Sequence, residues 1–234
     1  MSEPLLLIPG LMCTAALFAP QVEAFAGGRQ VIVADHTQSG SMAEVARQIL
    51  AAAPPRFALA GLSMGVYLSL EIVAQAPDRV TRLALLDGKA RPDTAEQTAG
   101  RRTLLSMADE GRFMEITTGV LLQRLVAPHR LADEALRKTI VEMAADTGEA
   151  AFRRQMNAII TRRNYRPVLG QVNCPTLVLT GELDVITPPD CAQEMAAGIA
   201  GAQLEILHGC GHLATLEAPD AVNAALAGWL ARDA

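Results

Sequence analysis

The most constraining feature of this sequence is a G-x-S-x-G pattern at residues 61–65, which stands between two apolar runs. The run before it, 57–60, has the length of a buried strand, and the run after it, 66–73, suits a helix. A strand, a G-x-S-x-G turn and a helix form a nucleophile elbow, in which the turn holds its serine in a strained backbone conformation. Gly61 and Gly65 lack Cβ atoms, so the strand and the helix can approach closely there. The pattern predicts that the Ser63 hydroxyl projects into a cleft; the alternative is an ordinary turn between a strand and a helix.

Length and composition are those of one sizeable domain. The chain has 234 residues, of which 50% are apolar, so it can bury a full hydrophobic core and is not a disordered protein. Its net charge of −5 gives no reason to expect a nucleic-acid or membrane partner. No apolar stretch reaches the length of a transmembrane helix, and the first residues lack the basic start of a signal peptide. We therefore expect a cytoplasmic protein, and the sequence leaves its oligomeric state open.

The cysteines have no spacing that would suit a metal site. We interpret them as small thiols of the core, and we expect neither a metal nor an organic cofactor. The four are Cys13, Cys174, Cys191 and Cys210.

Short apolar runs alternate with helical segments along most of the chain, which predicts an α/β protein with a mostly parallel sheet covered on both faces. Six strands are expected, at 5–8, 31–35, 57–60, 80–87, 175–181 and 203–208. Between the fourth and the fifth, the sequence is typical of helices alone, expected at 93–109, 112–126, 131–146 and 149–163. We interpret residues 91–170 as a helical cap over the ligand-binding edge of a core formed by 1–90 and 171–234.

A serine nucleophile needs a base, and the base needs an acid to orient it. Two later loops provide them, because Asp184 follows the fifth predicted strand and His212 follows the sixth. Parallel strands bring both loops to the edge of the sheet where Ser63 lies, in the chain order Ser, Asp, His. We predict that Ser63 is the nucleophile, that His212 is the general base and then the acid, and that Asp184 orients the imidazole. The N–H of Met64 points where an oxyanion would form.

These features together resemble the α/β-hydrolase superfamily, and within it small bacterial carboxylesterases and enol-lactone hydrolases. The resemblance rests on residues 61–65, 180–184 with Pro188-Pro189, 209–212 and the loop that begins with Pro9-Gly10. It implies an α/β-hydrolase fold in which the chain begins at the family's third strand, so that the first two family strands are missing. It also implies that the loop after the first strand donates a second oxyanion N–H. By position this donor is Leu11, with Met12 as the alternative.

Several other residues compete for these roles. Asp87 ends the fourth predicted strand, where some relatives of the superfamily place the acid, but the loop of Asp184 matches the family better. Glu182 is expected to face away from the site, and His208 is expected to be a strand-end residue. His36 follows the second predicted strand and could line the cleft, but we expect it in a solvent-facing loop, and we expect His129 on the surface.

A serine at the elbow favours acyl transfer to water, whereas dehalogenases and epoxide hydrolases of this fold have an aspartate there. We therefore expect a serine hydrolase that cleaves a small carboxylic ester or lactone through an acyl-enzyme. One alternative is hydrolysis of a carbon–carbon bond, or an elimination, by the same residues on a carboxylated substrate. A second alternative, of another class, is a protein that binds a small ligand without turning it over.

Residues 91–170 carry more Arg and Lys than Asp and Glu, which would favour anionic substrates. The simpler interpretation, which we prefer, is that these arginines cover solvated helix faces. They are Arg101, Arg102, Arg153, Arg154, Arg162 and Arg163. A few of the apolar side chains at helical spacing should line a pocket. The candidates are Leu104, Leu105, Met107, Phe113, Leu121, Leu122, Met156 and Ile160.

Overall fold

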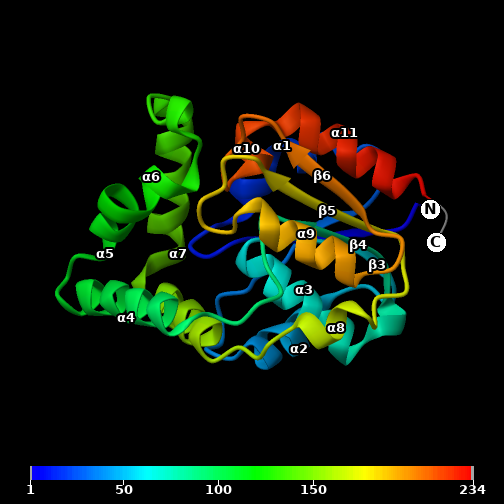
Figure 1. The fold of residues 1–234 in the computed structure, drawn as a ribbon, viewed down its shortest axis with the longest axis horizontal. Coiled ribbons are helices and arrows are strands. Elements are labelled where there is room, and N and C mark those ends of the chain that lie inside the picture. Colours follow the sequence, from blue (N-terminus) through cyan, green and yellow to red (C-terminus); the bar gives the residue numbers. More distant parts are fainter. Residues whose placement is uncertain (1, 233–234) are drawn as a thin grey trace.

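The computed structural model describes residues 2–232 and contains one six-stranded sheet in which every neighbouring pair of strands is parallel (Figure 1). The strands are β1 (Leu5–Ile8), β2 (Val31–Val33), β3 (Phe57–Leu62), β4 (Val80–Leu86), β5 (Thr176–Gly181) and β6 (Gln203–Leu207). They lie in the order β2-β1-β3-β4-β5-β6, so only the connection from β2 to β3 passes over another strand, β1. The parallel six-stranded sheet predicted from the sequence is confirmed.

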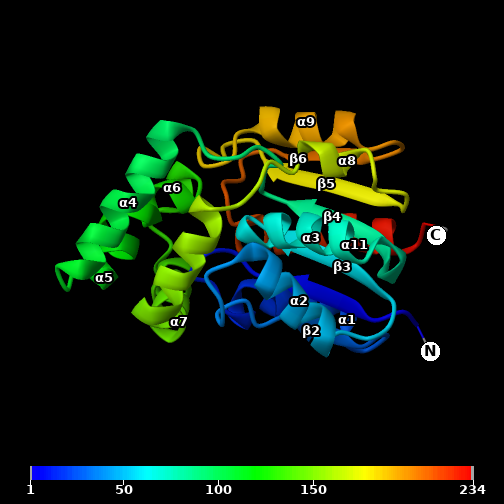
Figure 2. The ribbon, with the colours of Figure 1, turned by 90° about the horizontal axis from the view of Figure 1, so that it is seen from below.

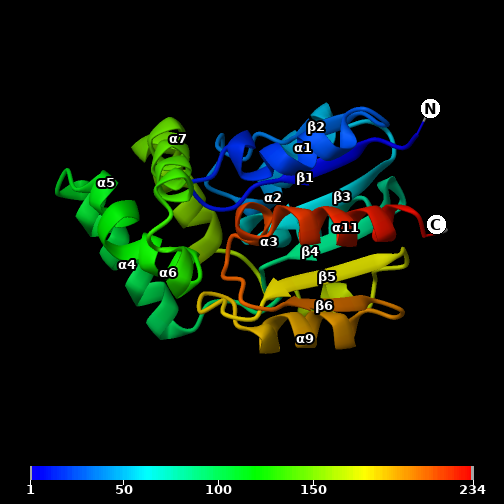
Figure 3. The same ribbon diagram turned by 90° about the horizontal axis from the view of Figure 1, so that it is seen from above.

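The central strands are apolar on both faces because helices cover both. Along β1, Leu6 and Ile8 pack into one hydrophobic cluster, while Leu5 and Leu7 pack into the other. The first cluster lies under α2 (Met42–Ala52), α3 (Met64–Gln75), α8 (Arg166–Leu169) and α9 (Pro189–Gly198), as Figure 2 shows. The second lies under α1 (Ala19–Phe25), α10 (Ala214–Glu217) and α11 (Pro219–Leu230), on the face seen in Figure 3.

A helical segment between β4 and β5 stands beyond the carboxyl ends of the strands (Figures 1 and 3). Its long elements are α4 (Ala95–Asp109) and α7 (Glu134–Ile160), which pack against each other. Its short elements are α5 (Phe113–Glu115), the π-helix η3 (Ile116–Leu121), α6 (Leu122–Leu125) and the turn η4 (Pro128–Arg130). A small apolar cluster of its own, in which the rings of Phe113 and Phe152 lie 5.5 Å apart, holds these helices together.

The helix expected over 112–126 is divided into α5, η3 and α6. The element α7 consists of two helices that meet at a kink at Gly148, where the sequence predicts a break; this residue has φ 74° and ψ 159°. Glycine adopts such a positive φ without a steric penalty, so the chain changes direction there. No helix among residues 2–232 has both the length and the apolar character needed to cross a membrane.

Candidate active site

The turn at the end of β3 holds Ser63 in a backbone conformation that few residues adopt. Its φ is 57° and its ψ is −110°, and its N–H donates to the carbonyl of Leu86 at the end of β4. The flanking glycines make this turn possible. A Cβ on Gly61 would overlap the Gly65 carbonyl, and a Cβ on Gly65 would overlap the carbonyl oxygen of Ile8 in β1. The structure therefore forms the sharp elbow that the G-x-S-x-G pattern predicts.

Three predicted site residues form a continuous hydrogen-bonded chain. The Ser63 hydroxyl lies 2.8 Å from His212 Nε2, and His212 Nδ1 lies 2.7 Å from Asp184 Oδ2. Asp184 also accepts hydrogen bonds from the backbone N–H groups of Ile186 and Thr187 and from the Thr187 hydroxyl. His212 and Asp184 are buried at 2% and 3% exposure, so little water competes for these contacts. The arrangement allows His212 to take a proton from Ser63 while Asp184 holds the imidazole.

Two buried carboxyl groups, those of Asp184 and Asp87, lie near His212. Their different surroundings shift their pKa values in opposite directions. Burial by itself would raise the pKa of Asp184, but His212 and the hydrogen bonds from Thr187 outweigh it and lower that pKa. Burial, and then repulsion from Asp184, raise the pKa of Asp87 well above its usual range. Asp87 accepts from the N–H groups of Gly181 and Ala214 instead of contacting His212. The structure therefore places Asp184, and not Asp87, against the imidazole.

The other histidines and Glu182 lie away from the Ser63 hydroxyl. Glu182 pairs with His208 at 2.6 Å on the surface, and His129 is also exposed. The prediction for His36 is wrong, because it is only 2% exposed. Its Nε2 lies 2.9 Å from the carbonyl oxygen of Gly10, and this polar partner makes the burial of the ring possible.

The loop after β1 lies beside Ser63 and presents two candidate oxyanion donors. The Met12 N–H donates to Gln155 Oε1 at 3.1 Å, so it is already engaged. Within residues 2–232, the N–H groups of Leu11 and Met64 have no acceptor. This difference favours Leu11 over Met12 as the second donor. Gln155 lies on α7, far along the chain, and no motif in the sequence signals it.

A cavity of about 90 Å³ opens at Ser63, between the elbow, the loop after β1 and the helical segment. Its wall is mostly apolar, and residues of α4, η3, α6 and α7 contribute to it. Of the apolar candidates from the sequence, Leu121 is in the wall, whereas Phe113 and Met156 pack inside the helical segment. The other apolar residues of the helical segment in the wall are Leu125, Ile140, Met143, Ala144 and Ile159. A small acyl group matches this volume and lining.

Comparison with known proteins identifies the family. The family model described as "Alpha/beta hydrolase family" matches residues 5–225. The chain belongs to the alpha/beta hydrolase family. Its relatives are enzymes, and we place this chain among the hydrolases of the family.

The relatives differ in the reactions that their names give. The chain is 27% identical over 195 residues to the Klebsiella pneumoniae 2-hydroxy-6-oxononadienedioate/2-hydroxy-6-oxononatrienedioate hydrolase, covering 74% of this chain and 62% of that enzyme, which is less than two thirds of its length. It is 28% identical to a Variovorax paradoxus protein provisionally named carbamate hydrolase, and the match covers 98% of this chain and 92% of that protein. An esterase from Thermogutta terrifontis has the same fold, with a TM-score of 0.88, 24% identity, and 98% of this chain and 90% of that chain covered.

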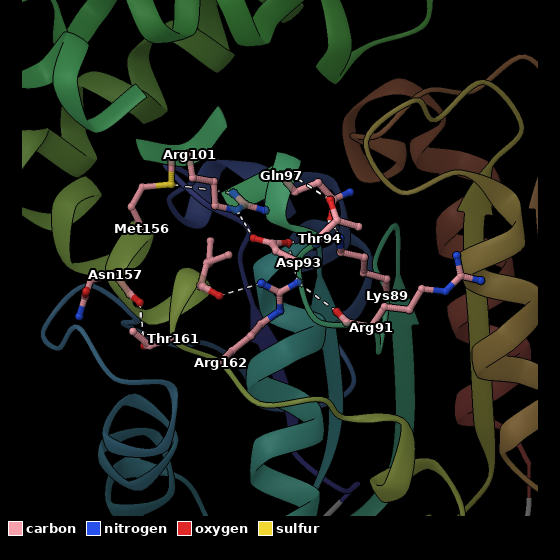
Figure 4. A network of polar contacts seen from close by, with 11 residues as sticks. Lys89, Arg91, Asp93, Thr94, Gln97, Arg101, Met156, Asn157, Thr161 and Arg162 are labelled. Atoms are coloured by element: carbon pink, nitrogen blue, oxygen red, sulfur yellow. Dashed lines mark hydrogen bonds and ion pairs between the residues drawn. The ribbon is translucent and has the colours of Figure 1, made fainter. Parts of the chain in front are cut away.

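A buried cluster of charges, drawn in Figure 4, adjoins the hydrolase pocket. It reaches the pocket through Arg101 of α4, which lines the wall. The Asp93 carboxylate, 2% exposed, lies 2.8 Å from Arg162 Nη2, 2.6 Å from Arg101 Nε and 3.3 Å from Lys89 Nζ. The Arg162 guanidinium also lies 4.2 Å from the centre of the Tyr67 ring, which lines the pocket. One carboxylate therefore faces three cations beside the cavity.

The cluster corrects part of the interpretation of the arginines. The side chain of Arg162 is 1% exposed, so it does not cover a solvated face, and Arg101 lines the pocket. Three of the other arginines have partners outside the pocket: Arg153 with Glu149 and Asp109, Arg154 with the Thr37 carbonyl, and Arg163 with Glu71. Arg102 is exposed. Hydrophobic periodicity does not reveal this difference, because Arg101 and Arg102 are neighbours and only Arg101 turns inward.

We expect Asp93→Asn to lower the free energy of unfolding by about 3 kcal/mol at neutral pH, because buried cations would lose their counter-charge. Burial alone would raise the pKa of Asp93, but hydrogen bonds from Arg162 and Arg101 outweigh it and hold that pKa far below its usual range. The stabilisation is therefore complete above the unfolded-state pKa of about 4 and is lost as the pH falls toward the folded-state value. Urea denaturation of both proteins from neutral pH downward should show the difference shrinking in acid.

Asp190→Asn is the matched control, because Asp190 makes an exposed ion pair with Arg91. Its loss should cost less than about 1 kcal/mol. Equal stability of Asp93→Asn and the wild type at neutral pH would contradict the account of this cluster.

The acidic, thiol and imidazole groups of the described residues also bear on the question of a metal site. Residues 2–232 contain no group of three or more His, Cys, Asp or Glu side chains arranged to hold a metal ion. Cys13 lines the pocket, but burial raises the pKa of its thiol to about 12, so it is not a nucleophile at neutral pH.

Proposed function

We propose that this hydrolase cleaves small carboxylic esters or lactones through an acyl-enzyme on Ser63. The observation that carries the proposal is the 2.8 Å contact between Ser63 Oγ and His212 Nε2, with Asp184 bonded to the other ring nitrogen. A serine that donates to an imidazole so oriented has the arrangement of an activated nucleophile.

In the proposed reaction, Ser63 Oγ attacks the substrate carbonyl carbon while His212 Nε2 takes the hydroxyl proton. The N–H groups of Leu11 and Met64 stabilise the oxyanion that forms. When the carbon–oxygen bond to the alcohol breaks, His212 returns the proton to the leaving oxygen. A water molecule then repeats the sequence on the acyl-enzyme, and the acid and free Ser63 result. Asp184 stabilises the imidazolium in both halves of the reaction.

The helical segment would act in this reaction as a cap, residues 91–170, over a core of residues 1–90 and 171–234. The cavity supports this role, because its wall combines Ser63 and His212 of the core with apolar side chains of η3, α6 and α7. A cap of this kind excludes water from the acyl group and selects substrates by size.

The test is hydrolysis of p-nitrophenyl esters from acetate to laurate by the wild type and by Ser63→Ala. We expect turnover of the short esters and a loss of at least about 10⁴-fold in kcat for Ser63→Ala, because no other group supplies the nucleophile. The small cavity should make kcat/KM for laurate at least about tenfold lower than for butyrate. Undiminished turnover by Ser63→Ala would overturn the proposal.

A second candidate function is hydrolysis of a carbon–carbon bond, or an elimination, on a carboxylated substrate. Arg101 favours it, because its guanidinium lines the pocket and its Nη1 has a thioether sulfur, that of Met156, as its hydrogen-bond partner 3.9 Å away. The Klebsiella pneumoniae relative is named for a dienedioate substrate, which carries carboxylates. A third function, ligand binding without turnover, finds less support, because Ser63 lies within hydrogen-bond distance of His212.

Arg101→Gln should separate charged from neutral substrates. We expect kcat/KM for p-nitrophenyl hydrogen glutarate to fall by about tenfold, because a charge-assisted hydrogen bond to the free carboxylate is lost. The neutral ester of the same chain length, p-nitrophenyl valerate, should change by less than about twofold.

Arg102→Gln is the matched control, since it removes the same charge from the next, exposed residue of α4. It should leave both esters unaffected. An equal loss on both esters in Arg101→Gln would exclude a role for Arg101 in recognising a carboxylate.

A further inference from the structure

The loop after β1 contains a strained residue beside the reacting serine. Met12 has φ 56°, a left-handed conformation that is uncommon for a long side chain. Such a conformation persists only where the surroundings determine it. The Met12 side chain packs into the apolar cluster of the helical segment, and the two peptide groups around Leu11 contact buried polar side chains from distant parts of the chain.

The first contact fixes the peptide group that joins Gly10 to Leu11. His36 Nε2 lies 2.9 Å from the Gly10 carbonyl oxygen. A carbonyl oxygen only accepts, so we assign the ring proton to Nε2. In a planar trans peptide the Gly10 C=O and the Leu11 N–H point in opposite directions. Anchoring the oxygen therefore aims the N–H, and donation to the oxygen also polarises the peptide and strengthens that N–H as a donor.

The second contact fixes the next peptide group, which joins Leu11 to Met12. Gln155 on α7 is fully buried, and its Oε1 accepts from the Met12 N–H at 3.1 Å. The same side chain touches His36, with 3.1 Å between Gln155 Nε2 and His36 Nε2. In the tautomer assigned here, His36 Nε2–H donates to the Gly10 carbonyl, so the contact with Gln155 Nε2 joins two donors and adds no hydrogen bond. Residues from two separate segments, the loop after β2 and α7, thus fix this loop.

We propose that His36 and Gln155 are positioning residues that aim the Leu11 N–H at the oxyanion formed on the substrate of Ser63. The inference rests on the proposed acyl transfer. Because Gln155 belongs to α7, the proposal also implies that the oxyanion hole is complete only when the helical segment is packed against the sheet. Neither side chain lines the cavity, so neither touches substrate.

The experiment compares His36→Phe and Gln155→Met, which remove the polar contacts, with His36→Gln, which keeps an N–H donor. We expect kcat for p-nitrophenyl butyrate to fall by about 10- to 100-fold in the first two, less than the loss of a whole oxyanion donor. KM should change by less than about threefold, because the loop acts on the transition state. His36→Gln should recover most of the activity.

A transition-state readout separates positioning from a purely structural role. A short trifluoromethyl ketone adds reversibly to the serine and forms a tetrahedral oxyanion, so its inhibition constant should weaken in proportion to kcat/KM across the variants. Wild-type kcat in Gln155→Met would overturn the inference, and so would ketone affinity that stays constant while activity falls. If His36→Phe does not fold, Gln155→Met and His36→Gln decide the question. Inactivity of the wild type on every ester would instead overturn the proposed function.

Discussion

Asp184→Asn is expected to lower kcat on short esters by about 10⁴-fold while the fold stays intact. In the wild type, the Asp184 carboxylate accepts from His212 Nδ1 at 2.7 Å, which leaves Nε2 free to accept the Ser63 proton. An asparagine amide can present N–H to Nδ1 instead, and the ring proton then resides on Nε2, where it blocks the base. Steady-state kinetics with p-nitrophenyl butyrate, with circular dichroism as the folding check, measures the effect.

Glu182→Gln is the control for this prediction, because Glu182 lies in the same loop but is paired with the exposed His208. Its activity should stay within about twofold of the wild type. Retention of nearly full activity by Asp184→Asn, together with inactivity of Asp87→Asn, would assign the acid role to Asp87 instead.

The second large effect concerns stability. Gly65→Ala should destabilise the protein by more than about 4 kcal/mol, or prevent folding altogether, because the new Cβ would overlap the backbone carbonyl of Ile8. That carbonyl belongs to β1, which is paired with β2 on one side and β3 on the other, so the strand cannot move away without breaking the sheet. Soluble yield and urea denaturation would measure the loss.

Gly100→Ala provides the contrast, since no atom lies within 4 Å of a Cβ at this exposed position of α4. There the substitution should stabilise the protein by about 0.5–1 kcal/mol, because alanine loses less conformational entropy in a helix. A folded Gly65→Ala protein with the wild-type midpoint would contradict the close approach of α3 to β1.

The sheet and the positions of Ser63, Asp184 and His212 could be predicted because both follow from local patterns. A buried strand is visible as a short apolar run, and parallel strands end at the same edge. The loops that follow β3, β5 and β6 therefore lie at the same edge of the sheet. The glycines of the elbow add a steric requirement that few other turns share.

His36 and Gln155 could not be predicted in this way. The burial of His36 depends on its contact with the loop after β1 and with Gln155, which lies 119 residues away on α7. A polar residue followed by Thr and Gln is also typical of a solvated loop, so the local sequence favours the wrong environment.

The position of the Arg101 side chain in the pocket wall could not be predicted either, because it also depends on contacts between distant segments. Helical periodicity places residues on faces, but which face meets the pocket depends on how α4 packs on α7 and on the position of Asp93. Charge counts over residues 91–170 indicate a basic segment without distinguishing arginines away from the cavity from those that line it. Arg101, Arg153 and Arg163 all pair with carboxylates, and only the three-dimensional arrangement shows that Arg101 also lines the cavity.

The central claim is that Ser63 is an activated nucleophile, and covalent labelling tests it most directly. The protein would be incubated with a short alkyl fluorophosphonate and analysed by intact-mass and peptide mass spectrometry. We predict one adduct per chain, on Ser63, with no adduct in Ser63→Ala and much slower labelling in Asp184→Asn. An unlabelled wild type, or an adduct on another residue, would contradict the claim.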